Sequence, residues 1–330
     1  MREAAFIKNN KARWVLFEAV LERKKSIDPD KLADLYIEIT DDLSYAKTFY
    51  PNSNTEAYLN TVASEAHQKI YTTKKESKNR LIRFFKEEFP LEFYQYQKQL
   101  LIAFVVFSFF TLVGMYSAAT DGDFVRLIMG DGYVNMTLEN IESGDPMAVY
   151  KQQSEMSMFI GITLNNVKVA MYAFVLGMLF SVGTLYVMMQ NGIMLGSFLY
   201  FFYDKGLLWE SSRTIWIHGT IEIAVIVIAG SAGLVLGSGL LFPKTYTRLA
   251  SFMKSVKAGL KIMVSTIPFF IIAGFLEGFV TRHTEMPDAL AILIIVASLF
   301  FILYYYVYYP IKKIRQKEQE IALELTHKPT

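Results

Sequence analysis

Long apolar segments dominate the chain between residues 99 and 309. A helix that crosses a bilayer needs about 20 consecutive, predominantly apolar residues. Five segments meet this requirement: 100–118, 167–189, 215–242, 261–280 and 289–309. A sixth, 193–203, is shorter and follows Asn191-Gly192, so it is either a short or tilted crossing or a re-entrant piece shielded by protein. We therefore expect an all-α, polytopic membrane protein with about six transmembrane segments, the third of them short or broken.

The distribution of charge indicates how these segments are oriented. Loops on the cytoplasmic side of a membrane carry an excess of lysine and arginine. Basic residues precede the first segment, fill residues 243–257 and continue into the tail 310–330, whereas the loop 119–162 is mostly acidic. All these regions agree on one topology if the third segment crosses the membrane. The sequence thus predicts six crossings, cytoplasmic termini and an outer loop at 119–162.

Residues 1–98 have the composition of a soluble helical domain. Trp14, Phe17 and Leu21 recur at helical spacing, and we expect no signal peptide before them. This part is predicted to be a cytoplasmic domain, followed by a transmembrane domain at 99–309. The stretch 78–89 alternates basic with aromatic residues, which suits either a helix on the membrane surface or a continuation of the domain's third helix. We expect Pro90 to end it.

Ionisable residues are scarce within the apolar segments, where they are costly to bury. His218 and Glu222 are four residues apart and therefore share a helix face. Glu277 in the fifth segment is predicted near the same outer side. His218 and Glu222 could relay protons, hold a cation or hydrogen-bond a facing helix, and we expect the last of these. Because no third ligand is evident, we expect no metal.

Asparagines and glycines form a second group of candidates. Asn165 and Asn166 open the second segment and Asn191 closes it, which suits capping and a turn, or else the polar lining of a cavity. Glycines recur in a pattern that lets helices approach closely. They are Gly192, Gly196, Gly219, Gly233, Gly237, Gly274 and Gly278. We expect them to pack helices within one subunit; the alternative is a homodimer interface.

Several functional classes find no support in the chain. It carries no phosphate-binding glycine loop, no serine–histidine–aspartate pattern and no nucleic-acid-binding module. It contains no cysteine, which excludes disulfides and thiolate ligands. We therefore expect no enzymatic activity, no cofactor and no nucleic-acid partner; the lipid bilayer is the one partner that the composition requires.

Three motifs follow one another in the membrane half. They are Asn165-Asn166 with Gly177 and Gly183, then Asn191-Gly192 with Gly196, then His218-Gly219 with Glu222 and the glycine-rich run 230–239. In this order they resemble the stage II sporulation protein M family of bacterial and archaeal membrane proteins. The resemblance implies an anchor in the cytoplasmic membrane that, in spore formers, works with peptidoglycan-degrading partners.

From this resemblance we expect a non-catalytic scaffold whose outer loop engages envelope proteins. The alternative is a transporter or permease component that uses the pair formed by His218 and Glu222. Interrupted helices often mark substrate sites in transporters, which gives this alternative some support from the third segment.

Overall fold

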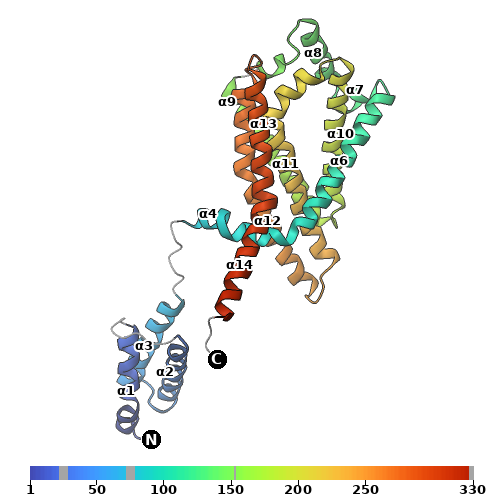
Figure 1. The fold of residues 1–330 in the computed structure, drawn as a ribbon. Coiled ribbons are helices and arrows are strands. Elements are labelled where there is room, and N and C mark those ends of the chain that lie inside the picture. The colour runs from blue at the N-terminus through green and yellow to red at the C-terminus, as the bar shows by residue number, and fades with distance from the viewer. Residues whose placement is uncertain (22–28, 72–78, 152–153, 327–330) are drawn as a thin grey trace. The chain divides into compact units, whose positions relative to one another are not determined.

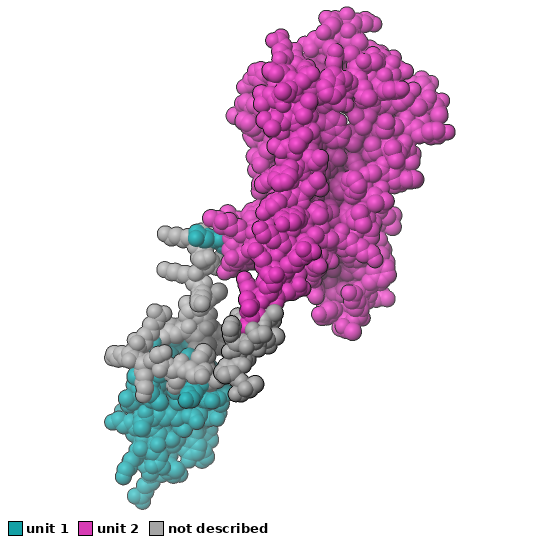
Figure 2. Space-filling view, in the orientation of Figure 1, with its two compact units in different colours: residues 1–80 teal, residues 81–330 magenta. Residues whose placement is uncertain are grey.

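The chain is described by a computed structural model that covers residues 1–21, 29–71, 79–151 and 154–326. Every regular element among these residues is a helix. They form two compact units, residues 1–80 and 81–330 (Figure 2). The division falls earlier than the expected boundary at residue 98. Residue 78 of the predicted amphipathic stretch and the end of the tail, 327–330, lie outside the described residues.

The first unit consists of three helices, α1 (Glu3–Leu21), α2 (Pro29–Phe49) and α3 (Asn54–Tyr71). Their apolar faces meet in a core that includes Phe17, Ile39 and Leu59. Asp42 adds a buried polar contact, because its Oδ2 accepts a hydrogen bond of 2.7 Å from Nε1 of Trp14. This is the helical N-terminal domain that the sequence predicts, and its cytoplasmic location stays a prediction.

The second unit contains six helical segments that are long and apolar enough to cross a membrane (Figure 1). They are Arg80–Thr120, Glu155–Met178, Val182–Asp204, Leu208–Leu241, Arg248–Thr281 and Asp288–Glu320. The predicted number of six candidate spans is thus confirmed. The main helices are α6 (Gln97–Thr120), α9 (Glu155–Val175), α10 (Val182–Asp204), α11 (Leu208–Leu241), α12 (Arg248–Phe275) and α13 (Asp288–Leu303).

The predicted limits of the second and third segments are wrong. The turn between them lies at residues 179–181, where Phe180 and Ser181 have positive φ angles of 52° and 68°, and not at 190–192. The third segment is therefore a continuous helix of 23 residues, neither short nor broken. Asn191 fits inside this helix because its Nδ2 donates to the Val187 carbonyl (2.8 Å). Asn165-Asn166 does not open the second segment as predicted, because the pair lies in the middle of α9.

The stretch before the first span also differs from expectation. The helical path runs through α4 (Arg80–Arg83), the π-helical turn η1 (Phe84–Glu88), α5 (Phe89–Phe93) and the short 3₁₀ turn η2 (Tyr94–Tyr96) into α6. Pro90 does not end it, because the proline's missing N–H falls where the π-helical hydrogen bonding of η1 changes to the α-helical pattern of α5. The hydroxyl of Tyr305, on the π-helical turn η6 (Tyr304–Tyr308), donates to the Phe85 carbonyl (3.0 Å). The stretch thus packs against the C-terminal helices, of which α14 (Tyr309–Thr326) is the last.

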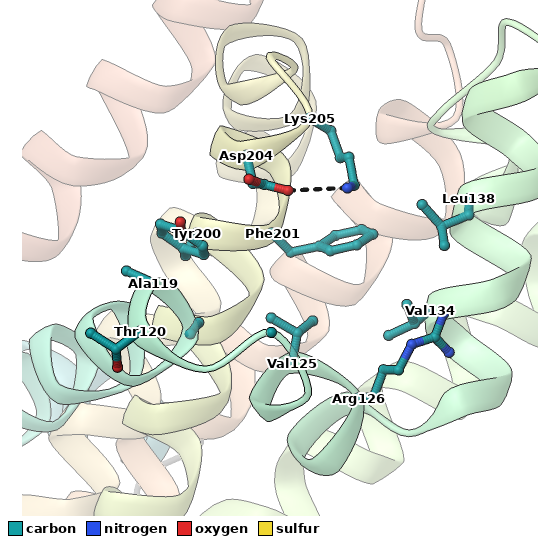
Figure 3. A pocket seen from close by; sticks show the side chains of 12 residues that line it. Ala119, Thr120, Val125, Arg126, Val134, Leu138, Tyr200, Phe201, Asp204 and Lys205 are labelled. Carbon is teal, nitrogen blue, oxygen red and sulfur yellow. Dashed lines mark hydrogen bonds and ion pairs between the residues drawn. The ribbon is translucent and has the colours of Figure 1, made fainter.

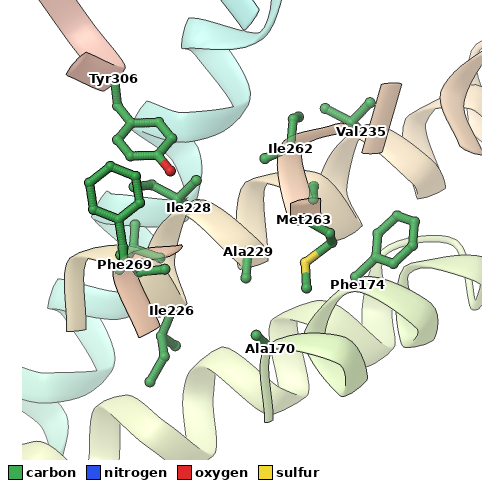
Figure 4. Packing of buried hydrophobic residues seen from close by; sticks show 14 of the residues in the cluster. Ala170, Phe174, Ile226, Ile228, Ala229, Val235, Ile262, Met263, Phe269 and Tyr306 are labelled. Carbon is green, nitrogen blue, oxygen red and sulfur yellow. The ribbon is translucent and has the colours of Figure 1, made fainter. Parts of the chain in front are cut away.

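α11 is the central helix of this unit and contacts α6, α9, α10, α12 and α13. Of the 18 most apolar consecutive residues of this span, 78% are buried inside the protein, against 17% in the first and last spans. The outer spans therefore present their apolar faces outward. Figure 4 shows Ala229 of α11 between Ala170 of α9 and the α12 side chains Met263 and Phe269. These small and large side chains together form the main apolar core.

Most of the predicted glycines lie where two helices meet inside the chain. A Cβ at Gly192 would come within 2.9 Å of the Phe107 carbonyl oxygen on α6, and one at Gly196 would collide with Thr111 on the same helix. Gly233 and Gly237 of α11 face the end of α9 and the turn that follows it, and Gly274 and Gly278 face α9. Gly219 differs, since a Cβ there would meet only Ile215 of its own helix.

A folded segment rich in acidic residues covers one end of the bundle. This acidic cap, residues 121–151, contains α7 (Phe124–Met129), α8 (Asp131–Glu142) and the short 3₁₀ turn η3 (Ala148–Lys151). Val125, Val134 and Met147 of the cap bury their side chains with Phe201 and Phe202 of α10. The predicted outer loop 119–162 is therefore largely helical, and its last residues already belong to α9.

Candidate functional site

A cluster of ionisable side chains lies inside the bundle near its acidic end. His218 and Glu222 are one turn apart on α11, and Glu277 lies in the π-helical turn η5 (Leu276–Thr281) that continues α12. One nitrogen or carboxylate oxygen from each of the three lies within 4.8 Å of the others. The sequence predicts only the shared face of the first two. Packing of α12 against α11 supplies the third potential ligand, which was not evident from the sequence.

His218 is held by two neighbours from η5. Its side chain is buried, and Nδ1 lies 2.9 Å from Oγ1 of Thr281, within hydrogen-bond distance. Nε2 on the other side of the ring lies 3.6 Å from Oε2 of Glu277. That separation is longer than a hydrogen bond. The ring is thus oriented by Thr281 and points its second nitrogen at the two carboxylates.

Asn166 of α9 lies next to Glu222 at the third side of the cluster. Its side chain is only 4% exposed, and its Nδ2 makes no hydrogen bond. Buried polar groups are normally paired, so an orphan amide in such a place calls for an explanation. Asn165, predicted together with Asn166, is exposed on the other face of α9, three residues before the exposed Lys168.

Two tyrosines of the acidic cap lie close to the cluster. The ring of Tyr150 contacts the imidazole of His218 edge-on, with 5.8 Å between ring centres. Burial raises the pKa of the Tyr150 hydroxyl well above its ordinary value, and the negative charge of Glu277 adds to this. Burial and Glu277 also raise the pKa of Tyr133. The cap therefore covers the cluster with hydroxyl groups that stay protonated at neutral pH.

The arginines near the cluster are paired with other acids. Arg282, next to Thr281, pairs with Glu155 at 3.2 Å, and Arg213 of α11 pairs with Asp288. Among the described residues, no lysine or arginine forms an ion pair with Glu222 or Glu277. The two carboxylates therefore face a histidine, an asparagine and tyrosine hydroxyls, without a permanent cation to balance them.

The cap and the end of α10 enclose a pocket of about 360 Å³ (Figure 3). Val125 and Val134 line its apolar side, and the Arg126 side chain lies beside Val134 (Figure 3). Asp204 and Lys205 lie on the opposite side and form an ion pair of 3.0 Å. The pocket thus combines apolar walls with charges of both signs, at the end of the bundle and not between the membrane helices.

Thr281 and Tyr150 contact His218 of the cluster but were not predicted from the sequence. Thr281 follows Glu277 by four residues, the same spacing as the predicted pair on α11, and that spacing is a usable signal in retrospect. Tyr150 gives no such signal, because only the fold of the cap brings it to His218. Asn191, a predicted site residue, is not part of the cluster, because its side chain hydrogen-bonds the backbone of its own helix.

Residues 103–282, more than half of the chain, match the sequence model of the family described as Stage II sporulation protein M. The chain belongs to the stage II sporulation protein M family. The match covers α6 to η5 almost entirely and therefore includes every residue of the cluster. Residues 4–72, the three-helix unit, match a second family, described as Domain of unknown function (DUF8413).

One curated relative is similar to part of this stage II sporulation protein M family member. It is "Uncharacterized protein MJ0706" of Methanocaldococcus jannaschii, 26% identical over 132 residues. The similar region is 39% of this chain and 58% of that protein, so the chain spans little more than half the length of its relative. No solved structure matches the chain.

Proposed function

We propose that this member of the stage II sporulation protein M family is a non-catalytic membrane scaffold. In this proposal the acidic cap faces the outside of a bacterial or archaeal cytoplasmic membrane and binds an envelope protein. The observation that carries it is the folded cap: its helices bury Val125, Val134 and Met147 on α10 and enclose the pocket near Arg126. A rigid surface with apolar walls and paired charges suits protein recognition better than a loose loop does.

The packing of the membrane helices is consistent with an anchoring role. α11 is buried over most of its length, and Gly233 lets the backbone of α9 and the Thr184 side chain of α10 approach it closely. Such close contacts favour one rigid arrangement. The family resemblance adds the kind of partner, a protein that remodels the cell envelope.

Crosslinking in intact cells tests the scaffold. The chain has no cysteine, so Ser143→Cys in the cap and Ala250→Cys at the opposite end of the bundle each provide a single attachment point for a crosslinker. Both positions are exposed. We expect the Ser143→Cys variant to capture an envelope protein that the matched Ala250→Cys variant does not. Capture of nothing but the chain itself at Ser143→Cys, at normal abundance, would contradict the scaffold.

A second candidate function is cation-coupled transport, favoured specifically by the buried cluster of His218, Glu222 and Glu277. Ionisable groups buried inside membrane-spanning helices commonly mark an ion or proton pathway. Here, Glu222→Gln would abolish solute uptake or efflux by liposomes that contain the protein. Unchanged fluxes of every solute tested would remove this candidate and leave the scaffold.

A further inference from the structure

We propose that His218, Glu222 and Glu277 bind a divalent transition metal ion inside the bundle of this stage II sporulation protein M family member. The three side chains come from α11 and η5, which are far apart in the sequence, and each presents one ligand atom within 4.8 Å of the others. The site is independent of the cap surface, so its presence does not depend on the scaffold being correct.

Lone pairs from three side chains meet in the cluster. A histidine that ligates a metal through one ring nitrogen usually donates its other N–H to an oxygen, which fixes the ring. Nδ1 of His218 has such an oxygen, Oγ1 of Thr281, at 2.9 Å. In the tautomer whose Nδ1–H donates to Thr281, Nε2 carries a lone pair and faces the carboxylates of Glu277 and Glu222, which also offer only lone pairs when ionised. A cation between them turns this repulsion into coordination.

The two carboxylates of the cluster have no ion-pair partner among the described lysines and arginines. The nearby arginines Arg213 and Arg282 are paired with Asp288 and Glu155. Two ionised carboxylates without a counter-charge are expensive in a low-dielectric interior. A divalent cation neutralises both at once, and none of the described lysines or arginines is placed to do so.

A third, independent observation is the orphan amide of Asn166. Its side chain is buried and lies beside Glu222, close enough to influence that carboxylate, yet Nδ2 makes no hydrogen bond of ordinary distance and angle. The oxygen and nitrogen of an amide exchange places by a half-turn about χ2, with little change in shape. Turned in this way, Asn166 presents Oδ1 beside Glu222 in place of Nδ2 and offers a fourth potential ligand.

The distances and the donor atoms indicate which ions fit. A Zn²⁺ site with bonds of about 2.0–2.1 Å separates its ligand atoms by roughly 3.4 Å. The 3.6 Å between Nε2 of His218 and Oε2 of Glu277 is close to that value. An oxygen of Glu222 lies within 4.8 Å of both atoms and would move closer when the ion binds. One imidazole nitrogen with carboxylate oxygens and no sulfur suits Zn²⁺, Mn²⁺ or Co²⁺ and does not suit Cu(I).

Metal content of the purified full chain tests the proposal. The protein, without an affinity tag, is stripped with a chelator in detergent, exposed to Zn²⁺, passed through a desalting column and analysed by mass spectrometry for metal and protein. We expect about one Zn²⁺ per chain in the wild type and at least a tenfold lower content in His218→Gln and in Glu277→Gln. The matched control His283→Gln replaces an exposed histidine at the same end of the bundle, and it should retain the full content.

Two results would overturn the site. One is a wild-type protein that retains less than a tenth of an equivalent of Zn²⁺, which needs no variant to interpret. The other is full Zn²⁺ content in monodisperse His218→Gln or Glu277→Gln, which would show adventitious binding elsewhere. If both variants aggregate, the X-ray absorption spectrum of the Zn²⁺-loaded wild type decides. An imidazole together with oxygen ligands supports the site, and a spectrum without imidazole overturns it.

Discussion

Thr281 sets the orientation of His218, because its hydroxyl oxygen lies 2.9 Å from Nδ1 of the ring. Thr281→Val keeps the shape of the side chain but removes this partner. Loss of such an outer contact typically weakens metal binding 10- to 100-fold. We therefore expect the Kd for Zn²⁺ to rise by that factor in Thr281→Val and to change little in Thr281→Ser, as measured by competition with a chelator. Equal affinities in Thr281→Val and wild type would show that Thr281 does not position the ring.

Gly196 illustrates packing at the residue scale. A Cβ at this position would collide with backbone atoms of Thr111 and Met115 on α6, which cannot move aside as a flexible side chain would. We expect Gly196→Ala to lower the free energy of unfolding by about 1–3 kcal/mol, the usual cost of overpacking. The measurement is the midpoint of thermal unfolding in detergent.

Gly161→Ala is the matched control for this prediction, since a Cβ at Gly161 of α9 would meet nothing within 4 Å. Alanine is the better helix former, so the control should unfold at the same temperature as the wild type or slightly above it. A Gly196→Ala protein as stable as the Gly161→Ala protein would mean that α6 and α10 are not packed as closely as described.

Part of the cluster could be predicted from residues alone. The spacing of His218 and Glu222 fixes their shared face on any helix, because side chains four residues apart stack. Glu277 and Asn166 could not be assigned to them, since that depends on which faces of α12 and α9 meet α11. Such contacts are set by the packing of whole helices, for which one sequence carries no direct signal.

At the scale of elements, the turn between α9 and α10 decides where two spans begin and end. Asn191-Gly192 is typical of a turn, but Gly192 is needed there for contact with Phe107 of α6. The turn instead lies at residues 179–181, where Ser181 is the one polar residue and gives only a weak turn signal. Hydropathy thus predicts the number of spans correctly, whereas it misplaces this boundary by about ten residues.

Cysteine accessibility tests this boundary. We expect Phe180→Cys, on the exposed turn, to react with a maleimide in detergent or permeabilised membranes. Asn191→Cys, inside α10, should react at least tenfold more slowly, because its surroundings are helix and apolar side chains. If Asn191→Cys instead reacted rapidly with the maleimide and Phe180→Cys did not, the predicted break at 190–192 would be correct and the continuous third span would be contradicted.

At the scale of the whole molecule, the account depends on two chemically different ends of the membrane bundle. One end carries the acidic cap and the cluster of His218, Glu222 and Glu277, and the other carries the basic loop around Arg248. The excess of positive charge predicts that the basic end faces the cytoplasm. The scaffold proposal requires the same orientation, because a cap inside the cell could not meet envelope partners.

The most direct test is labelling of intact cells with a maleimide that cannot cross membranes. Ser143→Cys in the cap and Ala250→Cys in the basic loop are both exposed, so each reports the side on which its end lies. We predict that Ser143→Cys reacts in intact cells and that Ala250→Cys reacts only after the cells are permeabilised. The reverse pattern, or reaction of both in intact cells, would contradict the outward-facing cap and with it the proposed scaffold.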